Sequence, residues 1–86
     1  MSKTTVTWHV YMLECADNSL YTGITTDLTR RVEEHNSSNK GARYTRARRP
    51  VKLIYSETAE NRSAASKRES AIKKFTRNDK ILLTLS

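Results

Sequence analysis

The chain has 86 residues, 36% of them apolar, which is enough for one compact domain and too few for two. Sixteen lysines and arginines against nine acidic residues leave a net charge of +7, which favours a polyanionic partner such as nucleic acid over an acidic membrane surface. The single cysteine excludes an internal disulfide and a cysteine-based zinc cluster, and no apolar run approaches the ~20 residues of a membrane span. We therefore expect a cytoplasmic single-domain protein over residues 1–86, with its core at about 8–80 and no membrane contact.

Two strands joined by a tight turn are predicted near the N-terminus. β-branched and aromatic residues are concentrated over residues 8–14 and again over 20–25, and the sequence DNS between them is typical of a turn. The first strand is apolar on both faces, so we expect it to be covered on both sides. Gly23 leaves one face of the second strand bare, which indicates either close approach by a ligand or another backbone, or a bulge.

A helix that ends at residues 36–37 is predicted next, with Thr25 or Thr26 as its cap. Apolar side chains recur at helical spacing and define the face turned to the core, and Arg31 and His35 lie on that face. A guanidinium in such a place costs free energy unless a fixed anion meets it, so Arg31 is a candidate binding residue.

The remaining elements are a connection, a strand and two helices. Residues 37–50 are predicted to form a polar, basic connection, and residues 51–57 a third strand. A second helix is expected to begin near Asn61 or Ser63, and the tail is expected to form a short third helix capped by Asn78, with a strand as the alternative. The order strand, strand, helix, strand, helix, helix predicts a small α+β domain, in which helices flank a three-stranded antiparallel sheet.

Helical spacing also places Glu69 on the inward face of the second helix. One interpretation is a buried salt bridge between Glu69 and Arg31. The alternative is a site in which Arg31 binds a phosphate and Glu69 binds a divalent cation, so that each charge is balanced by a ligand.

Five residues stand in an order that resembles the GIY-YIG nuclease domain: Tyr11 in VYM, Tyr21 in YTG, Arg31 and His35 on one helix, and Glu69 on a later helix. The resemblance extends over most of the chain and is closest to the small stand-alone, UPF0213-like members, through the runs GARYTRARRPVKLIY and AASKRESAIKKF. The triplets VYM and YTG keep the tyrosines and the final glycine, and their other changes preserve strand character.

The resemblance implies a metal-dependent endonuclease that hydrolyses phosphodiester bonds in DNA, is structure-selective, and acts in DNA repair or recombination. One Mg²⁺ or Mn²⁺ would be held by Glu69, the phosphate by Arg31, and the attacking water by Tyr11 or Tyr21, with His35 assisting. A tyrosine acts as a base only where positive surroundings lower its pKa from about 10, and we expect the arginine, the metal and nearby lysines to do so. The family's polar residue beyond the metal-binding glutamate has no clearly matching position here.

Positive charge is dense in the connection before the third strand, where six cations and no acid surround an aromatic side chain that is a candidate for base stacking. This pattern favours a nucleic-acid groove, for DNA more than RNA, over a merely solvated basic loop. The residues expected to bind nucleic acid are Lys40, Arg43, Tyr44, Arg46, Arg48, Arg49, Lys73 and Lys74.

A non-catalytic DNA- or RNA-binding module that retains the nuclease fold is the alternative function. The inward carboxylate of Glu69 favours the enzyme, because a module that only binds a polyanion has no physical need for it. A protein that binds an acidic protein and no nucleic acid is a third possibility.

Overall fold

The computed structural model describes residues 6–85. Its sheet has three strands, all antiparallel, in the order β2-β1-β3: β1 (Trp8–Glu14), β2 (Leu20–Thr25) and β3 (Lys52–Ala59). The helices are α1 (Leu28–Ser37), α2 (Arg43–Arg46), α3 (Arg62–Lys73) and α4 (Arg77–Thr84). The predicted fold class, a three-stranded antiparallel sheet flanked by helices, is confirmed. No helix in the described part of the chain is long and apolar enough to cross a membrane.

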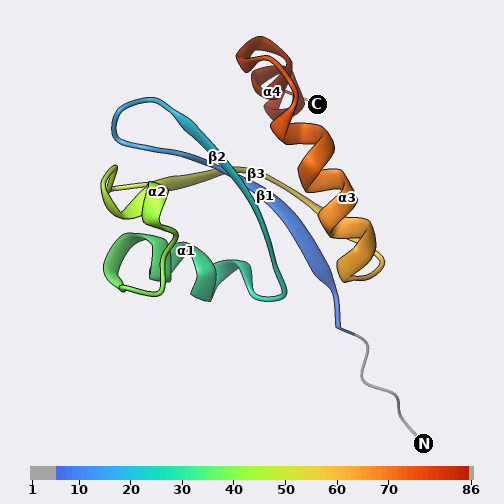
Figure 1. The fold of residues 1–86 in the computed structure, drawn as a ribbon, viewed down its shortest axis with the longest axis horizontal. Coiled ribbons are helices and arrows are strands. Elements are labelled where there is room, and N and C mark those ends of the chain that lie inside the picture. Colours follow the sequence, from blue (N-terminus) through green and yellow to red (C-terminus); the bar gives the residue numbers. More distant parts are fainter. Residues whose placement is uncertain (1–5, 86) are drawn as a thin grey trace, which may run out of the picture.

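The central strand β1 is buried on both faces, as its sequence predicts. Val10 and Met12 pack against Ala65 and Ile72 of α3 on one face. The opposite face carries a second core, to which α1 contributes. Figure 1 shows α1 and α2 on one side of the strongly twisted sheet, and α3 and α4 on the other. The buried members of the second core are Tyr11, Leu13, Cys15 and Val51.

The helix starts differ from the predicted ones in detail. Asp27 caps α1, in place of Thr25 or Thr26, because its carboxylate accepts a backbone N–H of the first turn. The hydroxyl of Thr25 instead accepts the backbone N–H of Asp27. The tail is helical, as expected, but Thr76 caps α4 rather than Asn78. Short polar side chains at neighbouring positions compete for the same cap, and sequence alone does not rank them.

Two other boundaries are corrected. The basic connection contains the short helix α2, and β3 continues to Ala59, beyond the predicted end of the strand. The expected start of α3 is confirmed, since the side chain of Asn61 accepts the backbone N–H of Ala64. The longer β3 pairs with the whole of β1, so tertiary pairing rather than local propensity sets its length.

Gly23 of β2 lies directly opposite Tyr11 of β1 in an unbroken register. The bulge interpretation is therefore wrong for this position, and the irregularity lies between β1 and β3, at Met12/Leu13. A Cβ at Gly23 would lie 2.5 Å from Oη and 2.7 Å from Cζ of Tyr11. The space beside Gly23 is thus occupied by the phenol of Tyr11, which crosses β2 at the position that has no side chain.

A Gly23→Ala variant should be destabilised, because its methyl group would overlap the Tyr11 ring and force the ring or the strand to shift. Overpacking of this kind costs about 1–3 kcal/mol, measurable by urea denaturation. The matched control is the same change in a Tyr11→Leu background, where the overlap is relieved and the cost of the alanine should shrink or reverse in sign. Equal costs in both backgrounds would contradict the close approach.

Candidate active site

A line of buried polar side chains connects β1, α1 and α2. The hydroxyl oxygen of Tyr11 lies 2.8 Å from Nε2 of His35. On the other side of the ring, Nδ1 lies 2.7 Å from Oγ1 of Thr45, whose hydroxyl is 2.9 Å from the carbonyl oxygen of Ala42. The three side chains are at most 1% exposed, so these contacts form away from competing water.

Aromatic rings extend this line toward the surface. The ring of Tyr21 packs edge-on against His35, with 5.2 Å between centroids, and lies 6.4 Å from the Tyr11 ring. Tyr44 of α2 stacks on Tyr21 at 5.9 Å, and the guanidinium of Arg48 lies 3.9 Å from the Tyr44 centroid. Groups of the same chain therefore already pack against Tyr44, which makes it a weaker platform for a nucleobase than its sequence context predicts.

Arg31 of α1 is half-buried at the rim of this cluster. Its Nη1 donates to Oε1 of Glu34 at 3.0 Å and to the backbone oxygen of Lys40 at 2.8 Å. Burial acts to lower the pKa of Arg31, but hydrogen bonding to Glu34 and the neighbouring Tyr11 hydroxyl outweighs it and raises the pKa. The guanidinium thus stays charged, and its counter-charge comes from its own helix.

Glu69 approaches from α3, which packs against the opposite face of the sheet. Its carboxylate is 19% exposed and lies 3.4 Å from Nζ of Lys73, one turn along the same helix. No ion pair joins Glu69 to Arg31 among residues 6–85, so the interpretation of the two as one buried salt bridge is wrong for the described chain.

The charges of Arg31 and Glu69 nevertheless both influence the pKa of one group, the Tyr11 hydroxyl. Burial raises the pKa of Tyr11 to about 12; the guanidinium of Arg31 lowers it, and the negative charges of Tyr21 and Glu69 add to the increase. Among the groups of the chain itself, desolvation therefore outweighs the nearby cation; the expected lowering of the tyrosine pKa, which included the charge of a bound metal, stays a prediction. Tyr11 is a neutral phenol at neutral pH.

The pKa of His35 is lowered to about 4, first by burial and then by the positive charge of Arg31. Its imidazole is therefore neutral at neutral pH. The central pair of the site, phenol and imidazole, therefore carries no charge at neutral pH.

Two of the cations predicted to bind nucleic acid are engaged within the chain. Nε of Arg49 donates to the backbone oxygen of His35 at 2.6 Å, and its Nη2 reaches the carbonyls of Glu34 and Ser38, so its guanidinium satisfies the last carbonyls of α1. Arg48 forms an ion pair with the hairpin turn between β1 and β2. Both hold the basic segment in place.

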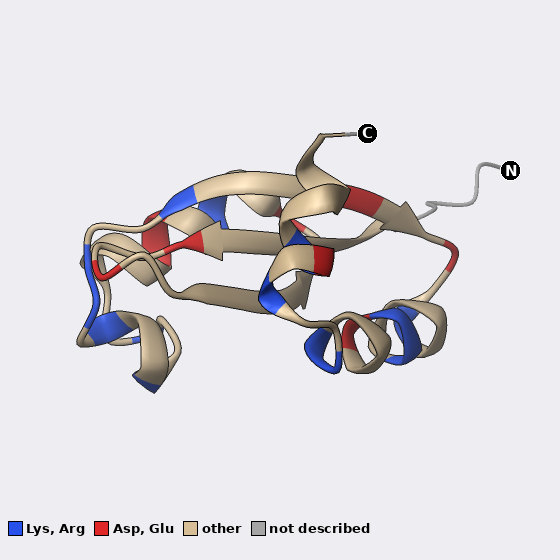
Figure 2. Cartoon of the chain, turned by 90° about the horizontal axis from the view of Figure 1, so that it is seen from above, with Lys and Arg blue, Asp and Glu red and all other residues tan. Residues whose placement is uncertain are grey.

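The other predicted binding residues have exposed side chains. Figure 2 shows Lys and Arg mainly on segments flanking the sheet, and Lys52 is the only one within a strand. Lys73 is paired with Glu69, and no ion pair in residues 6–85 involves the remaining four cations of the predicted set. These four are Lys40, Arg43, Arg46 and Lys74.

The sequence interpretation missed Thr45 and the structural use of Arg49. A signal was present in Gly41, where a Cβ would lie 2.7 Å from the backbone oxygen of Glu34 and 2.8 Å from Cα of His35. A glycine at this place lets the chain return tightly against the end of α1, which brings Thr45 beside the imidazole.

A divalent cation at this site would have one protein carboxylate, that of Glu69. Residues 6–85 contain no group of three or more His, Cys, Asp or Glu side chains arranged to hold a metal, so an all-protein metal cage is excluded for them. A single half-buried carboxylate suits Mg²⁺, which retains several waters and takes substrate phosphate oxygens as further ligands. The residues present fit that mode of binding.

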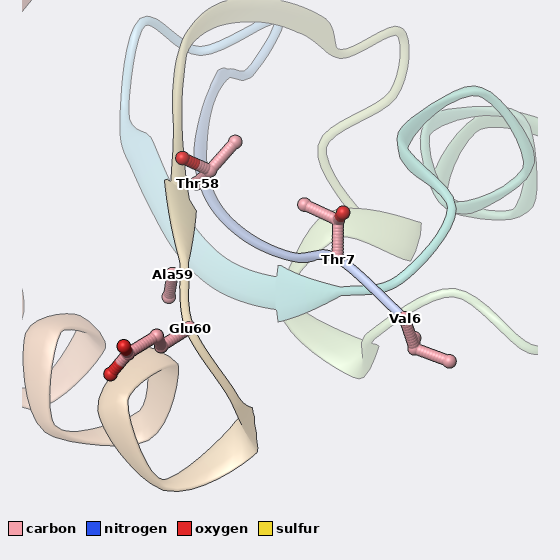
Figure 3. A pocket seen from close by; sticks show the side chains of 5 residues that line it. All are labelled: Val6, Thr7, Thr58, Ala59 and Glu60. Atoms are coloured by element: carbon pink, nitrogen blue, oxygen red, sulfur yellow. The ribbon is translucent and has the colours of Figure 1, made fainter. Parts of the chain in front are cut away.

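A shallow hollow elsewhere on the surface contains none of the predicted site residues. It lies where β1 begins and β3 ends, beside the start of α3, and is lined by small and apolar groups with one acid, Glu60 (Figure 3). The predicted catalytic and metal-binding side chains lie instead on β1, β2, α1 and α3.

The family model described as the GIY-YIG catalytic domain matches residues 7–81. The chain belongs to the GIY-YIG family. The predicted resemblance is thereby confirmed, and it places Tyr11, Tyr21, Arg31, His35 and Glu69 within the matched region.

Similar proteins carry the name UPF0213. One from Desulfotalea psychrophila is 65% identical over 69 residues, covering 80% of this chain and 63% of the relative, so this chain spans slightly less than two thirds of that relative's length. Another, from Haloquadratum walsbyi, is 56% identical over 72 residues, covering 84% of this chain and 80% of the relative.

Two solution NMR structures share the fold. A UPF0213 protein of Bacillus halodurans is 42% identical, with a TM-score of 0.56 over 90% of this chain and 81% of that one. A protein of E. faecalis is 44% identical, with a TM-score of 0.59 over 93% and 83%.

The stability of the chain should depend on pH through His35. The pKa of this residue is about 4 when folded against 6.5 ordinarily, so below pH 6.5 the unfolded chain takes up a proton that the folded chain refuses. The free energy of unfolding should therefore fall as pH drops from 6.5 toward 4, by up to about 3 kcal/mol from this residue, and be unaffected by it above 6.5.

Urea denaturation of the wild type and of His35→Gln at several pH values measures this effect, because the contributions of the carboxylates cancel in the difference. The stability advantage of the wild type should shrink across that window. Parallel stability curves for the two proteins would contradict a buried neutral imidazole.

Proposed function

We propose that the chain is a metal-dependent endonuclease that hydrolyses phosphodiester bonds in nucleic acid, preferentially DNA, with selectivity for nucleic-acid structure and a role in repair or recombination. The observation that supports it most is that a guanidinium of α1 and a carboxylate of α3, two charges that do not pair with each other, both act on the pKa of the Tyr11 hydroxyl. Hydrolysis of a diester requires charge neutralisation on the phosphate and a positioned water, and this arrangement supplies groups for both.

Arg31 is the proposed phosphate ligand. Its planar fork of donors matches the two non-bridging oxygens of a diester. The partners that now occupy it, Glu34 and the carbonyl of Lys40, are at the rim of the site, so a phosphate can replace them without disturbing the core. Bound phosphate would also offset the positive charge that depresses the pKa of His35.

Tyr11 is the residue that we propose to orient the attacking water. Its phenol is neutral, is fixed by His35 and has a pKa of about 12, so it orients water as a hydrogen-bonding group rather than as a standing base. The ring of Tyr21 lies beside the Tyr11 ring and is itself stacked by Tyr44 of α2. Glu69 would hold Mg²⁺ or Mn²⁺, and the ion when bound would supply positive charge to the phosphate and the leaving oxygen.

The cations that form no ion pairs within residues 6–85, above all Arg43 and Arg46 on α2, are the proposed contacts to the nucleic-acid backbone. Such contacts neutralise phosphates without reading bases, so we expect selectivity for shape rather than for sequence.

A binding module that does not cut nucleic acid is the second candidate, and one observation favours it. Lys73 lies 3.4 Å from the carboxylate of Glu69 and partly neutralises the group that would hold the metal. If this pair persists when nucleic acid binds, the fold supplies a charged surface and no metal ligand.

Cleavage assays with the variants Arg31→Gln and Glu69→Gln test the proposal. Purified protein with Mg²⁺ or Mn²⁺ should cut at least one of a panel of single-stranded, branched and duplex DNA substrates. Each variant should lose about 100-fold or more in rate, because each removes a charge that stabilises the transition state, while thermal unfolding changes little.

Arg30→Gln is the matched control, because it removes the same charge at the neighbouring position. The side chain of Arg30 is exposed and forms only a 3.9 Å ion pair, so this variant should retain activity. Unchanged rates in both test variants would place the chemistry elsewhere. If the wild type cuts no member of the panel, yet its affinity falls steeply with salt, the binding module is correct.

A further inference from the structure

The hydroxyl of Thr45 is the one polar group of the buried line that the proposed reaction leaves unused. It is 0% exposed, it lies on a helix of four residues, and it contacts the imidazole that holds Tyr11. We propose that Thr45 is a positioning residue, which fixes the tautomer of His35 with its proton on Nδ1 and thereby holds the Tyr11 hydroxyl as a donor to Nε2. The effect that we predict on the cleavage rate rests on the proposed function, whereas the assignment of the tautomer does not.

The distances around Nδ1 support this tautomer. The Thr45 hydroxyl has one proton and two oxygen or nitrogen neighbours, the carbonyl of Ala42 at 2.9 Å and Nδ1 of His35 at 2.7 Å. If that proton points to the carbonyl, the 2.7 Å contact needs a proton from Nδ1. If it points to Nδ1 instead, two acceptor oxygens face each other at 2.9 Å with no proton between them, which is unfavourable.

A longer contact argues for the other tautomer and is outweighed. The backbone N–H of Ala42 lies 3.3 Å from Nδ1 of His35, so an unprotonated Nδ1 would accept from it. That contact is at the long end of the range for a hydrogen bond, whereas the two contacts of Thr45 are short.

The surroundings of Tyr11 provide an independent argument. The nearby guanidinium of Arg31 is a donor only, so it faces the phenol oxygen and cannot accept the phenol proton. Of the two side chains in residues 6–85 that hydrogen-bond to that hydroxyl, Arg31 and His35, only the His35 ring can accept its proton. The proton of Tyr11 therefore needs an unprotonated Nε2, and this places the ring proton on Nδ1, opposite Thr45.

This tautomer sets the direction in which a proton would move during the reaction. With its proton committed to Nε2, the Tyr11 oxygen presents lone pairs toward the side of the site where Arg31 lies, and a water there donates to it. As such a water attacks phosphorus, its O–H bond breaks toward the Tyr11 oxygen while the Tyr11 O–H bond breaks toward Nε2. The proton thus ends on His35, and its positive ring remains hydrogen-bonded to Thr45. The bond from phosphorus to the leaving oxygen breaks in the same step, and the leaving oxygen takes a proton from solvent. No tyrosinate forms, which avoids the cost of ionising a buried phenol.

Nitrogen NMR of the histidine ring tests the tautomer without any substrate. At pH 7 the ¹⁵N spectrum of wild-type protein should show His35 with a protonated Nδ1 and an unprotonated Nε2. Thr45→Val, which keeps the shape and removes the hydroxyl, should move the proton to Nε2, and Thr45→Ser should preserve the wild-type pattern. A protonated Nε2 in the wild type, or an unchanged tautomer in Thr45→Val, would overturn the proposal.

Cleavage kinetics then test the link to the reaction. Thr45→Val should lose about tenfold or more in kcat with little change in KM, and Thr45→Ser should recover most of it. If Thr45→Val changes tautomer and cuts at the wild-type rate, the positioning role is wrong although the tautomer assignment holds. If the wild type cuts nothing while the NMR pattern is as expected, the proposed function fails and the assignment of the tautomer stands. Thermal unfolding of both variants, with Thr45→Ala as a third, separates loss of folding from these outcomes.

Discussion

The contact between the Tyr11 hydroxyl and the His35 ring, 2.8 Å apart and without access to solvent, is the constraint on which the rest of the site depends. To reach the ring, the phenol must cross β2, and it does so over Gly23, where even a methyl group would overlap it. The imidazole must in turn be fixed from behind, and Gly41 lets the chain return closely enough to place Thr45 there. Two glycines and one hydroxyl thus define where the phenol points.

The charges of the site arrive from two helices that pack on opposite faces of the sheet. Arg31 and Glu69 each pair with a residue on their own helix, and both still influence the Tyr11 hydroxyl. Burial controls the resting state: it holds the phenol neutral against the nearby cation, and together with that cation it holds the imidazole neutral. A bound diester changes this balance, since it brings negative charge to Arg31 and makes a proton on His35 less costly. The phenol and imidazole of the site are thus uncharged at neutral pH, beside a cation that an anion can neutralise.

Much of the fold followed from the sequence because its signals are local. The β-branched and aromatic residues of β1, the turn after it and the helical spacing around Arg31 and Glu69 each predict an element that the structure confirms. Helix caps were less predictable, since neighbouring Thr, Asp and Asn residues compete for the same N–H groups, and tertiary packing decides among them. The roles of Thr45 and Arg49 were missed, because both depend on how the basic segment folds back on the end of α1. Composition correctly marked that segment as basic but did not separate cations that hold it in place from those left exposed.

The pKa of Tyr11 in the wild type and in the Arg31→Gln and Glu69→Gln variants measures most directly whether the two opposite charges meet at one phenol. Fluorotyrosine labelling brings the titration to lower pH, below alkaline unfolding, and ¹⁹F NMR resolves each ring once the signals are assigned with Tyr→Phe variants. Relative to the labelled wild type, in which the Tyr11 pKa should be the one most clearly raised by burial, Arg31→Gln should raise it further and Glu69→Gln should lower it. A Tyr11 titration that neither substitution moves would show that the phenol does not sense these charges, and would contradict the account of the site.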